Sequence, residues 1–342
     1  MPDRGVPQDQ LDALLRALGA RIQRGDLNRM LRCGRFTLMH PIGRGGVAQV
    51  FAAVRDGDTS PNHAVKLFDP GVDAEDMLAR FEEERRIIRS IRHPCVIEMV
   101  DAGIHESGSP WFAMPLVDGS AITKEADERT LPLGQRLALA AAACEGLAAA
   151  HARNVVHRDV KPGNVIASCS GTTHQVRLID FGLARAMAGR RPRLTPAGAV
   201  HRMGTPDYMA PEQWTDGIAS CDARADVFAF GIMIGELLAG VVPRRTQAAP
   251  RSKTSSSGRR AKVAPAPACA PSEALSRQLE ADPSGVKAAA RRRGVSGAQD
   301  LLRIARDVID PLVTPLIAKS PADRPSDASA VLPLVATARR AV

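Results

Sequence analysis

Two short stretches decide the fold: HRDVKPGN at residues 157–164 and VRLIDFG at residues 176–182. Each holds an acid, Asp159 or Asp180, and the first also holds the amide of Asn164. Carboxylate and amide oxygens are suitable ligands for Mg²⁺, and a carboxylate can also accept the proton of an attacking hydroxyl. This combination is what a phosphoryl-transfer site requires.

A glycine-rich stretch, IGRGGVAQV at residues 42–50, lies upstream between two strand-like segments. Glycines there let backbone N–H groups approach phosphate oxygens, because no Cβ stands in the way. A glycine turn in an ordinary hairpin explains the stretch equally well. By itself it leaves both interpretations open.

Lys66 lies in an apolar strand, and a buried ammonium group needs an anionic partner. The helical run at residues 74–91 offers one, because Glu84 shares its apolar stripe with Phe81 and Ile88. We therefore expect Glu84 to face inward and pair with Lys66. Two ordinary surface charges are the alternative.

Taken together, these stretches resemble the Hanks-type, or eukaryotic-like, serine/threonine protein kinases. The resemblance runs in order from about Gly34 to Leu334. It implies an α+β, bilobal protein kinase fold, with a β-rich N-lobe that contains one helix and a mostly α-helical C-lobe. The Ala- and Arg-rich composition is typical of a bacterial member.

The resemblance also implies domain boundaries. An N-terminal helical extension occupies residues 1–33, the kinase domain residues 34–334 and a C-terminal tail residues 335–342. Within the kinase domain, the N-lobe spans residues 34–117 and the C-lobe residues 118–334.

The implied activity is transfer of the γ-phosphoryl group of ATP, with Mg²⁺, to serine or threonine hydroxyls of proteins in signalling. Asp159 accepts the hydroxyl proton, and Lys66 holds the α and β phosphates. Lys161 is typical of serine/threonine rather than tyrosine kinases. Asn164 and Asp180 bind the metal. The catalytic residues implied are Asp159, Lys66 and Lys161.

The adenine site follows from the same resemblance. Met114 lines the back of the pocket, and the N–H of Val117 meets the adenine. Val50, Ala64 and Ile166 sandwich the ring. The full set of implied ATP-site residues is Ile42, Gly43, Arg44, Gly45, Gly46, Val47, Ala48, Val50, Ala64, Lys66, Glu84, Met114, Val117 and Ile166.

Five further residues are implied as structural support. Glu212 pairs with Arg324 in a buried link. Asp226, near the start of an apolar helix, accepts backbone N–H bonds from the catalytic loop that contains His157 and Arg158.

Thr195 is the candidate phosphorylation site. Between Asp180 and Glu212 the only Ser or Thr residues are Thr195 and Thr205, and the resemblance assigns Thr205 to the substrate platform. A phosphate on Thr195 would enter a strongly basic segment and could order it through Arg158. Self-association for autophosphorylation is compatible with this hypothesis, and a solvated basic loop is the alternative.

The positive charge of the chain is concentrated in one segment. Residues 241–300 hold 12 Lys and Arg side chains but only 4 Asp and Glu, although the formal charge of the whole chain is +9. The Pro-, Ser- and Arg-rich composition predicts a basic low-complexity insertion at about residues 244–300, unfolded at least over residues 244–272. Because the chain has few aromatics for base stacking, a nucleic-acid partner is not expected.

Six scattered cysteines show no CxxC pair, which argues against a disulfide framework or a zinc site. The longest apolar stretches, residues 137–150 and 227–238, are short and interrupted, and no apolar signal segment opens the chain. We therefore expect reduced thiols, no membrane span and a cytoplasmic location.

Local periodicity predicts helices at residues 11–31, 133–151 and 223–238, with order resuming near Asp300. The first of these helices packs on the outside of the kinase domain or serves as a dimerisation element.

Ala48 departs from the family pattern, since a third loop glycine is usual at that position. All the charged groups are present, so we expect an active enzyme rather than a pseudokinase. A small-molecule phosphotransferase of the same fold and a scaffold that binds partners through the basic insertion are the competing hypotheses.

Overall fold

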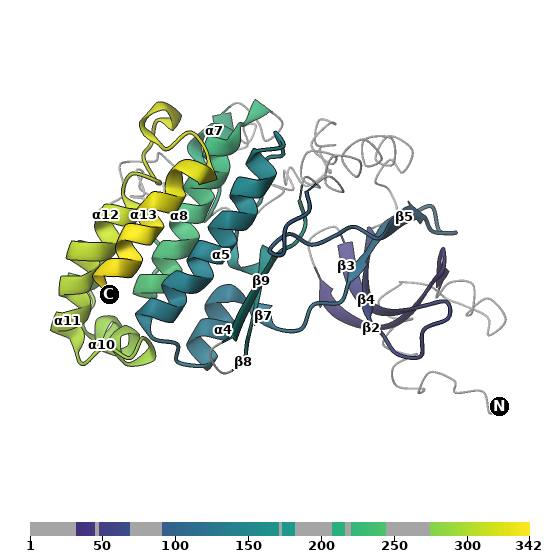
Figure 1. Cartoon of the computed structure of the whole chain (residues 1–342), viewed down its shortest axis with the longest axis horizontal. Helices are drawn as coiled ribbons and strands as arrows, with labels where there is room; N and C mark the ends of the chain where they lie inside the picture. Colours follow the sequence, from purple (N-terminus) through teal and green to yellow (C-terminus); the bar gives the residue numbers. More distant parts are fainter. Residues whose placement is uncertain are drawn as a thin grey trace, which may run out of the picture. The chain divides into compact units, whose positions relative to one another are not determined.

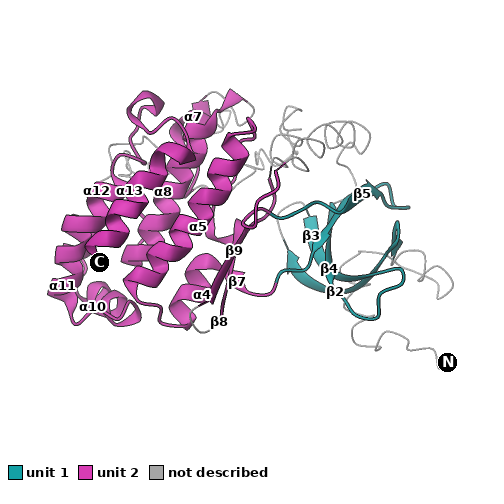
Figure 2. Ribbon diagram, viewed as in Figure 1, with its two compact units in different colours: residues 1–90, 97–117 teal, residues 91–96, 118–342 magenta. Residues whose placement is uncertain are grey.

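The computed structural model describes residues 32–44, 48–68, 91–170, 173–181, 207–215, 220–243 and 274–342. The chain forms two compact units, coloured separately in Figure 2. Unit 1 comprises residues 1–90 and 97–117, and unit 2 comprises residues 91–96 and 118–342.

Residues 91–96 belong to unit 2, although the sequence places them in the N-lobe. Val96 forms a parallel bridge with Leu178, and the Leu178 N–H donates to the carbonyl of Cys95 at 2.7 Å. These backbone bonds attach the segment to unit 2, and nothing in the sequence around residues 91–96 predicts them.

An antiparallel sheet with the order β1-β2-β3-β4-β6-β5 forms the described part of unit 1 (Figure 1). Its strands are β1 (Arg32–Cys33), β2 (Phe36–Arg44), β3 (Ala48–Arg55), β4 (His63–Phe68), β5 (Asp101–Ile104) and β6 (Pro110–Pro115). The predicted β-rich N-lobe is confirmed. The helix predicted at residues 74–91 lies, except for Ile91, outside the described residues.

The two faces of this sheet differ in chemistry because successive side chains of a strand point to opposite sides. One face forms a closed apolar core built around Phe36, Phe51, Val65, Trp111 and Ala113. The other face carries the alternating residues of the same strands. The cross-strand pairs on it are Val50 with Lys66, Lys66 with Phe112, and Ala64 with Met114.

Unit 2 combines a small sheet with a bundle of helices. The sheet contains β7 (Ser120–Ala121), β8 (Val165–Ser170) and β9 (Thr173–Leu178). The helices are α4 (Ile122–Glu128), α5 (Leu133–His151), η1 (Pro162–Asn164), α7 (Pro211–Thr215), α8 (Ala223–Ala239), α9 (Leu275–Glu280), α10 (Pro283–Arg292), α11 (Ala298–Ile304), η3 (Ala305–Ile309), α12 (Asp310–Val313), η4 (Pro321–Asp323) and α13 (Ala328–Ala341).

Helix α8 lies at the centre of unit 2, in contact with α4, α5, α9, α12 and α13. It is buried on nearly all sides, as expected of a helix that is apolar all round. The Asp222 side chain caps its first turn by accepting from the N–H of Arg224, and Gly240 ends it at φ +80°. These local signals explain why the helix begins at the predicted residue.

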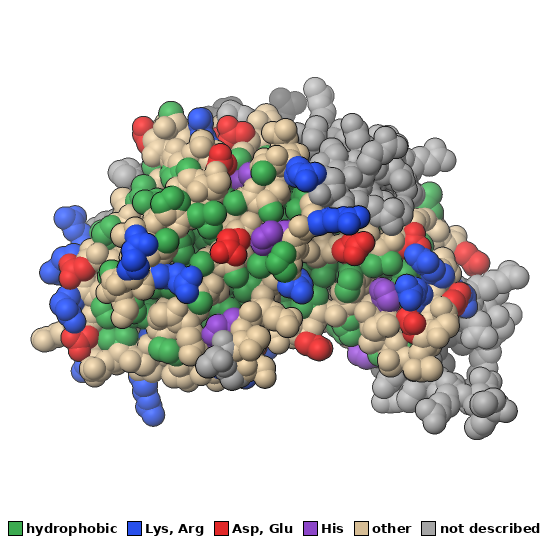
Figure 3. Space-filling view, in the orientation of Figure 1, with side chains coloured by type: hydrophobic (Ala, Val, Ile, Leu, Met, Phe, Trp, Pro, Cys, Tyr) green, Lys and Arg blue, Asp and Glu red, His purple; other side chains and the backbone are tan. Residues whose placement is uncertain are grey.

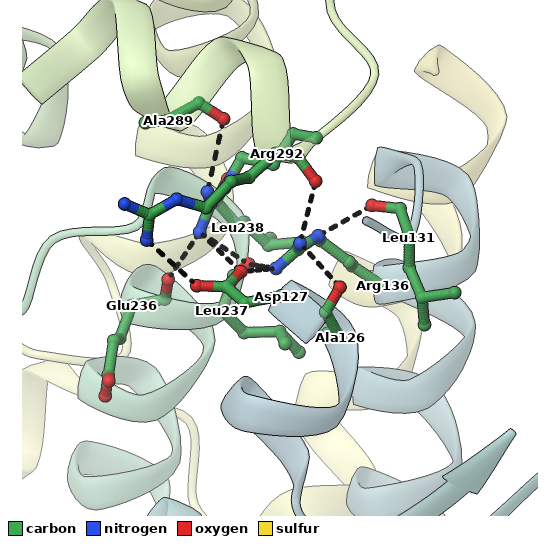
Figure 4. Close-up of polar contacts among 10 residues, drawn as sticks. Ala126, Asp127, Leu131, Arg136, Glu236, Leu237, Leu238, Ala289 and Arg292 are labelled. Carbon is green, nitrogen blue, oxygen red and sulfur yellow. Dashed lines mark hydrogen bonds and ion pairs between the residues drawn. The ribbon is translucent and has the colours of Figure 1, made fainter. Parts of the chain in front are cut away.

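Two buried arginines, Arg136 and Arg293, join the ends of several helices in unit 2, and Figure 4 labels the first of them. The side chain of Arg136 is 0% exposed and forms an ion pair with Asp127 at 2.7 Å. Its other donors reach backbone carbonyls of Ala126, Leu131, Leu237 and Arg292. Carbonyls at helix ends lack partners within the helix and carry partial negative charge, so they compensate a buried cation.

Arg293 is a second buried cation that donates to helix-end carbonyls, here at the C-terminus of α8. Its guanidinium donates to the carbonyls of Glu236, Leu237, Leu238 and Ala289. Burial and the neighbouring charge of Arg136 lower the pKa of Arg293 to about 10. A Cβ on Gly240 would lie 2.7 Å from this guanidinium, so glycine at this position serves both the turn and the close approach.

The predicted extent of the basic insertion is wrong at its C-terminal end. Residues 274–300 form α9, α10 and the start of α11, with Leu275, Leu279 and Val286 buried. Arg293, which falls within the predicted insertion, is buried because helix carbonyls surround it. Residues 244–273 and the helix predicted at residues 11–31 lie outside the described residues.

On the face of the molecule drawn in Figure 3, Lys and Arg side chains are interspersed with Asp and Glu. None of the helices in the described ranges is long and apolar enough to cross a membrane.

Candidate functional site

The two decisive stretches converge at one end of the β8–β9 hairpin. Val165 at the start of β8 pairs with Leu178 at the end of β9. The Ile179 N–H then donates to the carbonyl of Asn164 at 2.9 Å. This backbone bond places the loop that ends at Asn164 beside the residue that precedes Asp180.

Asp159 is held through one of its two carboxylate oxygens. Its Oδ2 accepts from Lys161 Nζ at 2.7 Å and from Asn164 Nδ2 at 2.9 Å. The same Asn164 nitrogen donates to the Asp159 carbonyl at 2.8 Å. The Asp159 side chain is 26% exposed, so a carboxylate oriented by its neighbours remains accessible to a reactant.

Asn164 and Asp180 fit a magnesium ion that phosphate oxygens would help to hold. Because the Asn164 amide nitrogen donates to Asp159, its carbonyl oxygen is the atom left for a cation. Within the described ranges, no group of three or more His, Cys, Asp or Glu side chains could hold a metal by itself. A site with one carboxylate suits Mg²⁺, which commonly binds through one or two carboxylates plus substrate phosphates.

Asp226 fixes the backbone that leads to Asp159. Its carboxylate accepts from the N–H of His157 at 2.6 Å and from the N–H of Arg158 at 2.7 Å. These are the contacts that the sequence predicts. A third donor, His151 Nε2 at 2.9 Å, was not anticipated.

The Asp226 carboxylate is ionised at neutral pH even though it is buried. Burial acts to raise its pKa, but the hydrogen bond from His151 and the N–H of His157 hold the pKa below its usual value. The His151 ring is itself fixed, because its Nδ1 accepts from the N–H of Ala328 at 3.0 Å. A single histidine at a helix end carries no signal of this role, since its partners lie far along the chain.

His157 packs against the second stretch. Its Nε2 donates to the carbonyl of Ile179 at 2.9 Å, and its ring centroid lies 4.5 Å from that of Phe181. The residue is 0% exposed. It therefore supports the two loops and has no access to a reactant.

The predicted pair of Glu212 and Arg324 is present and bidentate. The two guanidinium nitrogens donate to the two carboxylate oxygens at 2.6 and 3.0 Å. Arg324 also lies 4.8 Å from the ring centroid of Phe228, and its side chain is 0% exposed. This pair anchors α7 to the segment before α13.

In unit 1, the face opposite the apolar core carries the predicted adenine and phosphate residues. Ala64 and Met114 are buried and lie opposite each other on β4 and β6. Lys66 Nζ lies 5.7 Å from the ring centroid of Phe68 and 5.8 Å from that of Phe112, within range of cation–π attraction. The sequence did not mark Phe112, although its position directly opposite Lys66 places it at the same site.

The remaining predicted ATP-site residues are only partly described. Ile42, Gly43 and Arg44 end β2, where Ile42 is 46% exposed, and Ala48 begins β3. Val117 is half-buried at the end of unit 1, whereas Ile166 lies on β8 in unit 2. Gly45, Gly46, Val47, Glu84, Thr195 and Thr205 lie outside the described residues.

Comparison with known proteins finds relatives of this chain. The family model "Protein kinase domain" matches residues 36–332. The chain is 34% identical over 213 residues to serine/threonine-protein kinase pkn2 of Myxococcus xanthus, covering 61% of this chain and 25% of that protein. It is 37% identical over 216 residues to the DNA damage-responsive serine/threonine-protein kinase RqkA of Deinococcus radiodurans, covering 62% and 31%.

These first relatives are longer proteins, and the chain spans about a quarter to a third of their length. Among solved structures, the kinase domain of PknI from Mycobacterium tuberculosis matches with a TM-score of 0.59 at 24% identity. The match covers 92% of this chain and 99% of that one, and it shows a shared fold.

Proposed function

Because the chain belongs to the protein kinase domain family, we propose that it transfers the γ-phosphoryl group of ATP, with Mg²⁺, to serine and threonine hydroxyls of protein substrates. The observation that carries the proposal is the restraint of Asp159. Lys161 and Asn164 both bind its Oδ2, and Asp226 holds the backbone just before it.

The remaining oxygen of Asp159 orients the substrate hydroxyl and accepts its proton as the hydroxyl attacks. Lys161, whose Nζ binds Asp159 Oδ2, places a positive charge near the phosphoryl group that is transferred. The oxygens of Asn164 and Asp180 would hold the metal, which would supply neutralising charge at the phosphate oxygens. Holding the reactants in line is most of the catalytic task, since phosphoryl transfer needs little covalent chemistry from the protein.

Lys66 binds the α and β phosphates, with Glu84 as its anionic partner. Within unit 1, Val50, Ala64 and Met114 form apolar surroundings for the adenine, and Val117 offers its backbone N–H. The supporting observation is the register of β3, β4 and β6, which places Val50, Ala64, Lys66 and Met114 on one face of the sheet.

Incubation of the full chain with γ-labelled ATP, Mg²⁺ and casein tests the function. We expect acid-stable label on serine and threonine, and no label when EDTA removes the metal. A matched reaction that offers small-molecule alcohols in place of casein separates a protein kinase from a small-molecule phosphotransferase. Binding of Mg-ATP without any transfer would instead favour the scaffold hypothesis.

We also propose that the chain phosphorylates itself at Thr195. The support comes from the sequence, in which Thr195 stands among the basic residues Arg185, Arg190, Arg191 and Arg193. After incubation with Mg-ATP, mass spectrometry should find phosphate on Thr195, and Thr195→Ala should lower activity. An Asp159→Asn chain should stay unmodified alone and gain the phosphate when mixed with the unaltered chain. An unmodified Thr195 together with full activity of the Ala variant would contradict the proposal.

A further inference from the structure

The peptide that precedes Asp159 has an unusual conformation. Arg158 has φ +66°, in the left-handed region that residues other than glycine rarely adopt. Such a conformation persists only where the surroundings hold it. The polar groups on both sides of Arg158 are bound by side chains: the N–H donates to Asp226 Oδ1 at 2.7 Å, and the carbonyl accepts from Gln213 Nε2 at 3.0 Å.

Gln213 uses both ends of its amide. Its Oε1 accepts from the N–H of Ala210 at 2.8 Å, while its Nε2 donates to the Arg158 carbonyl. The amide can take only this orientation, because the N–H can only donate and the carbonyl can only accept. The residue is 6% exposed, so water does not readily replace either bond.

The helix that carries Gln213 is itself anchored. The preceding residue, Glu212, forms the bidentate pair with the buried Arg324. Gln213 therefore connects a fixed helix, α7, to the carbonyl of the peptide whose nitrogen belongs to Asp159. The orientation of that peptide plane sets the position of Asp159 Cα, from which the side chain extends.

We infer that Gln213 is a positioning residue for the reaction: it holds the Arg158–Asp159 peptide so that the Asp159 carboxylate faces the substrate hydroxyl. The inference rests on the proposed kinase function. It goes beyond that function because it assigns the orientation of the catalytic loop jointly to α8, through Asp226, and to α7, through Gln213. A role limited to α7 is the competing explanation, since the Ala210 bond by itself would stabilise the first turn of that helix.

Substitutions at one position separate the two bonds. Gln213→Glu keeps an acceptor for the Ala210 N–H but has no donor for the Arg158 carbonyl. Gln213→Met has similar length, no charge and neither function, so it controls for the added negative charge. Gln175→Glu makes the same charge change on an exposed position of β9.

In the full chain, we expect both Gln213 variants to lower kcat by about ten- to a hundredfold, with the KM for ATP within about twofold of the unaltered chain. Gln175→Glu should behave as the unaltered chain does. Hydrogen exchange gives a second readout that needs no activity. The peptide containing residues 156–160 should exchange faster in both Gln213 variants, whereas the amide of Ala210 should lose protection only in Gln213→Met.

Three results would overturn the inference. One is unchanged kcat in Gln213→Met despite a lowered melting temperature, which would mean a role limited to α7. Another is loss of kcat in Gln213→Glu alone, which would assign the effect to charge. The third is unchanged exchange of residues 156–160 in both variants. If the unaltered chain transfers no phosphate, the proposed function fails, and the exchange measurement still decides whether Gln213 restrains the loop.

Discussion

Replacing Asp159 with asparagine is expected to lower kcat by about 10²- to 10⁴-fold, the range typical for loss of general-base catalysis. The variant keeps the size of the side chain and one oxygen that can still accept from Lys161 and Asn164, so the loop should keep its geometry. The amide nitrogen then takes the place of the oxygen that accepts the hydroxyl proton. Phosphate transfer at saturating ATP measures kcat, and calorimetric titration measures ATP affinity.

ATP affinity of this variant should change little, because Asp159 contacts the acceptor hydroxyl rather than the nucleotide. Asp307→Asn provides the control, since Asp307 is exposed on η3 and the chemical change is the same. A kcat for Asp159→Asn that matches the control would show that another group acts as the base.

Arg324→Met should lower the free energy of unfolding of unit 2 by about 3–5 kcal/mol, the usual cost of removing one partner of a buried ion pair. The change leaves the Glu212 carboxylate, whose side chain is 14% exposed, without its bidentate partner. It also removes donors from the carbonyls of Ala318, Lys319 and Arg224. Urea unfolding followed by helical circular dichroism suits the measurement, because the described helices lie in unit 2.

Arg303→Met is the matched control for this prediction. Arg303 is 70% exposed and lies 3.7 Å from Asp300, so its removal should change stability by no more than about 0.5 kcal/mol. Adding Glu212→Gln to Arg324→Met should recover part of the loss, because the neutral amide costs less to leave buried. Equal stability of Arg324→Met and Arg303→Met would contradict a buried, stabilising pair.

Local signals were sufficient for the long helices of unit 2. Helix α5 spans Leu133–His151 as predicted, and α8 runs one residue past the predicted end. Apolar residues at short spacing define both, and the Asp222 cap and the left-handed Gly240 set the limits of α8. These apolar and capping residues lie within the helix or directly beside it in the sequence, so a local pattern is enough to predict it.

The residues of the candidate site fall into two groups: those that the sequence predicts and those that only the structure reveals. Asp159, Asn164 and Asp180 were recognisable because their chemistry and spacing occur in two short stretches. His151 and Gln213 were not, since their partners lie 177 and 55 residues away, and neither stands in a distinctive local pattern. Phe112 became visible only when the register of β4 and β6 placed it opposite Lys66.

The sequence by itself determined the fold class and the order of the lobes and predicted the two acids and the one amide of the candidate site, because each depends on residue type and local spacing. Tertiary structure alone decided the membership of residues 91–96 in unit 2, the folded state of residues 274–300 and the burial of Arg293. Composition treats an arginine as a solvated charge. Arg293 lies inside because the helix-end carbonyls that compensate its charge come together only when distant helices pack.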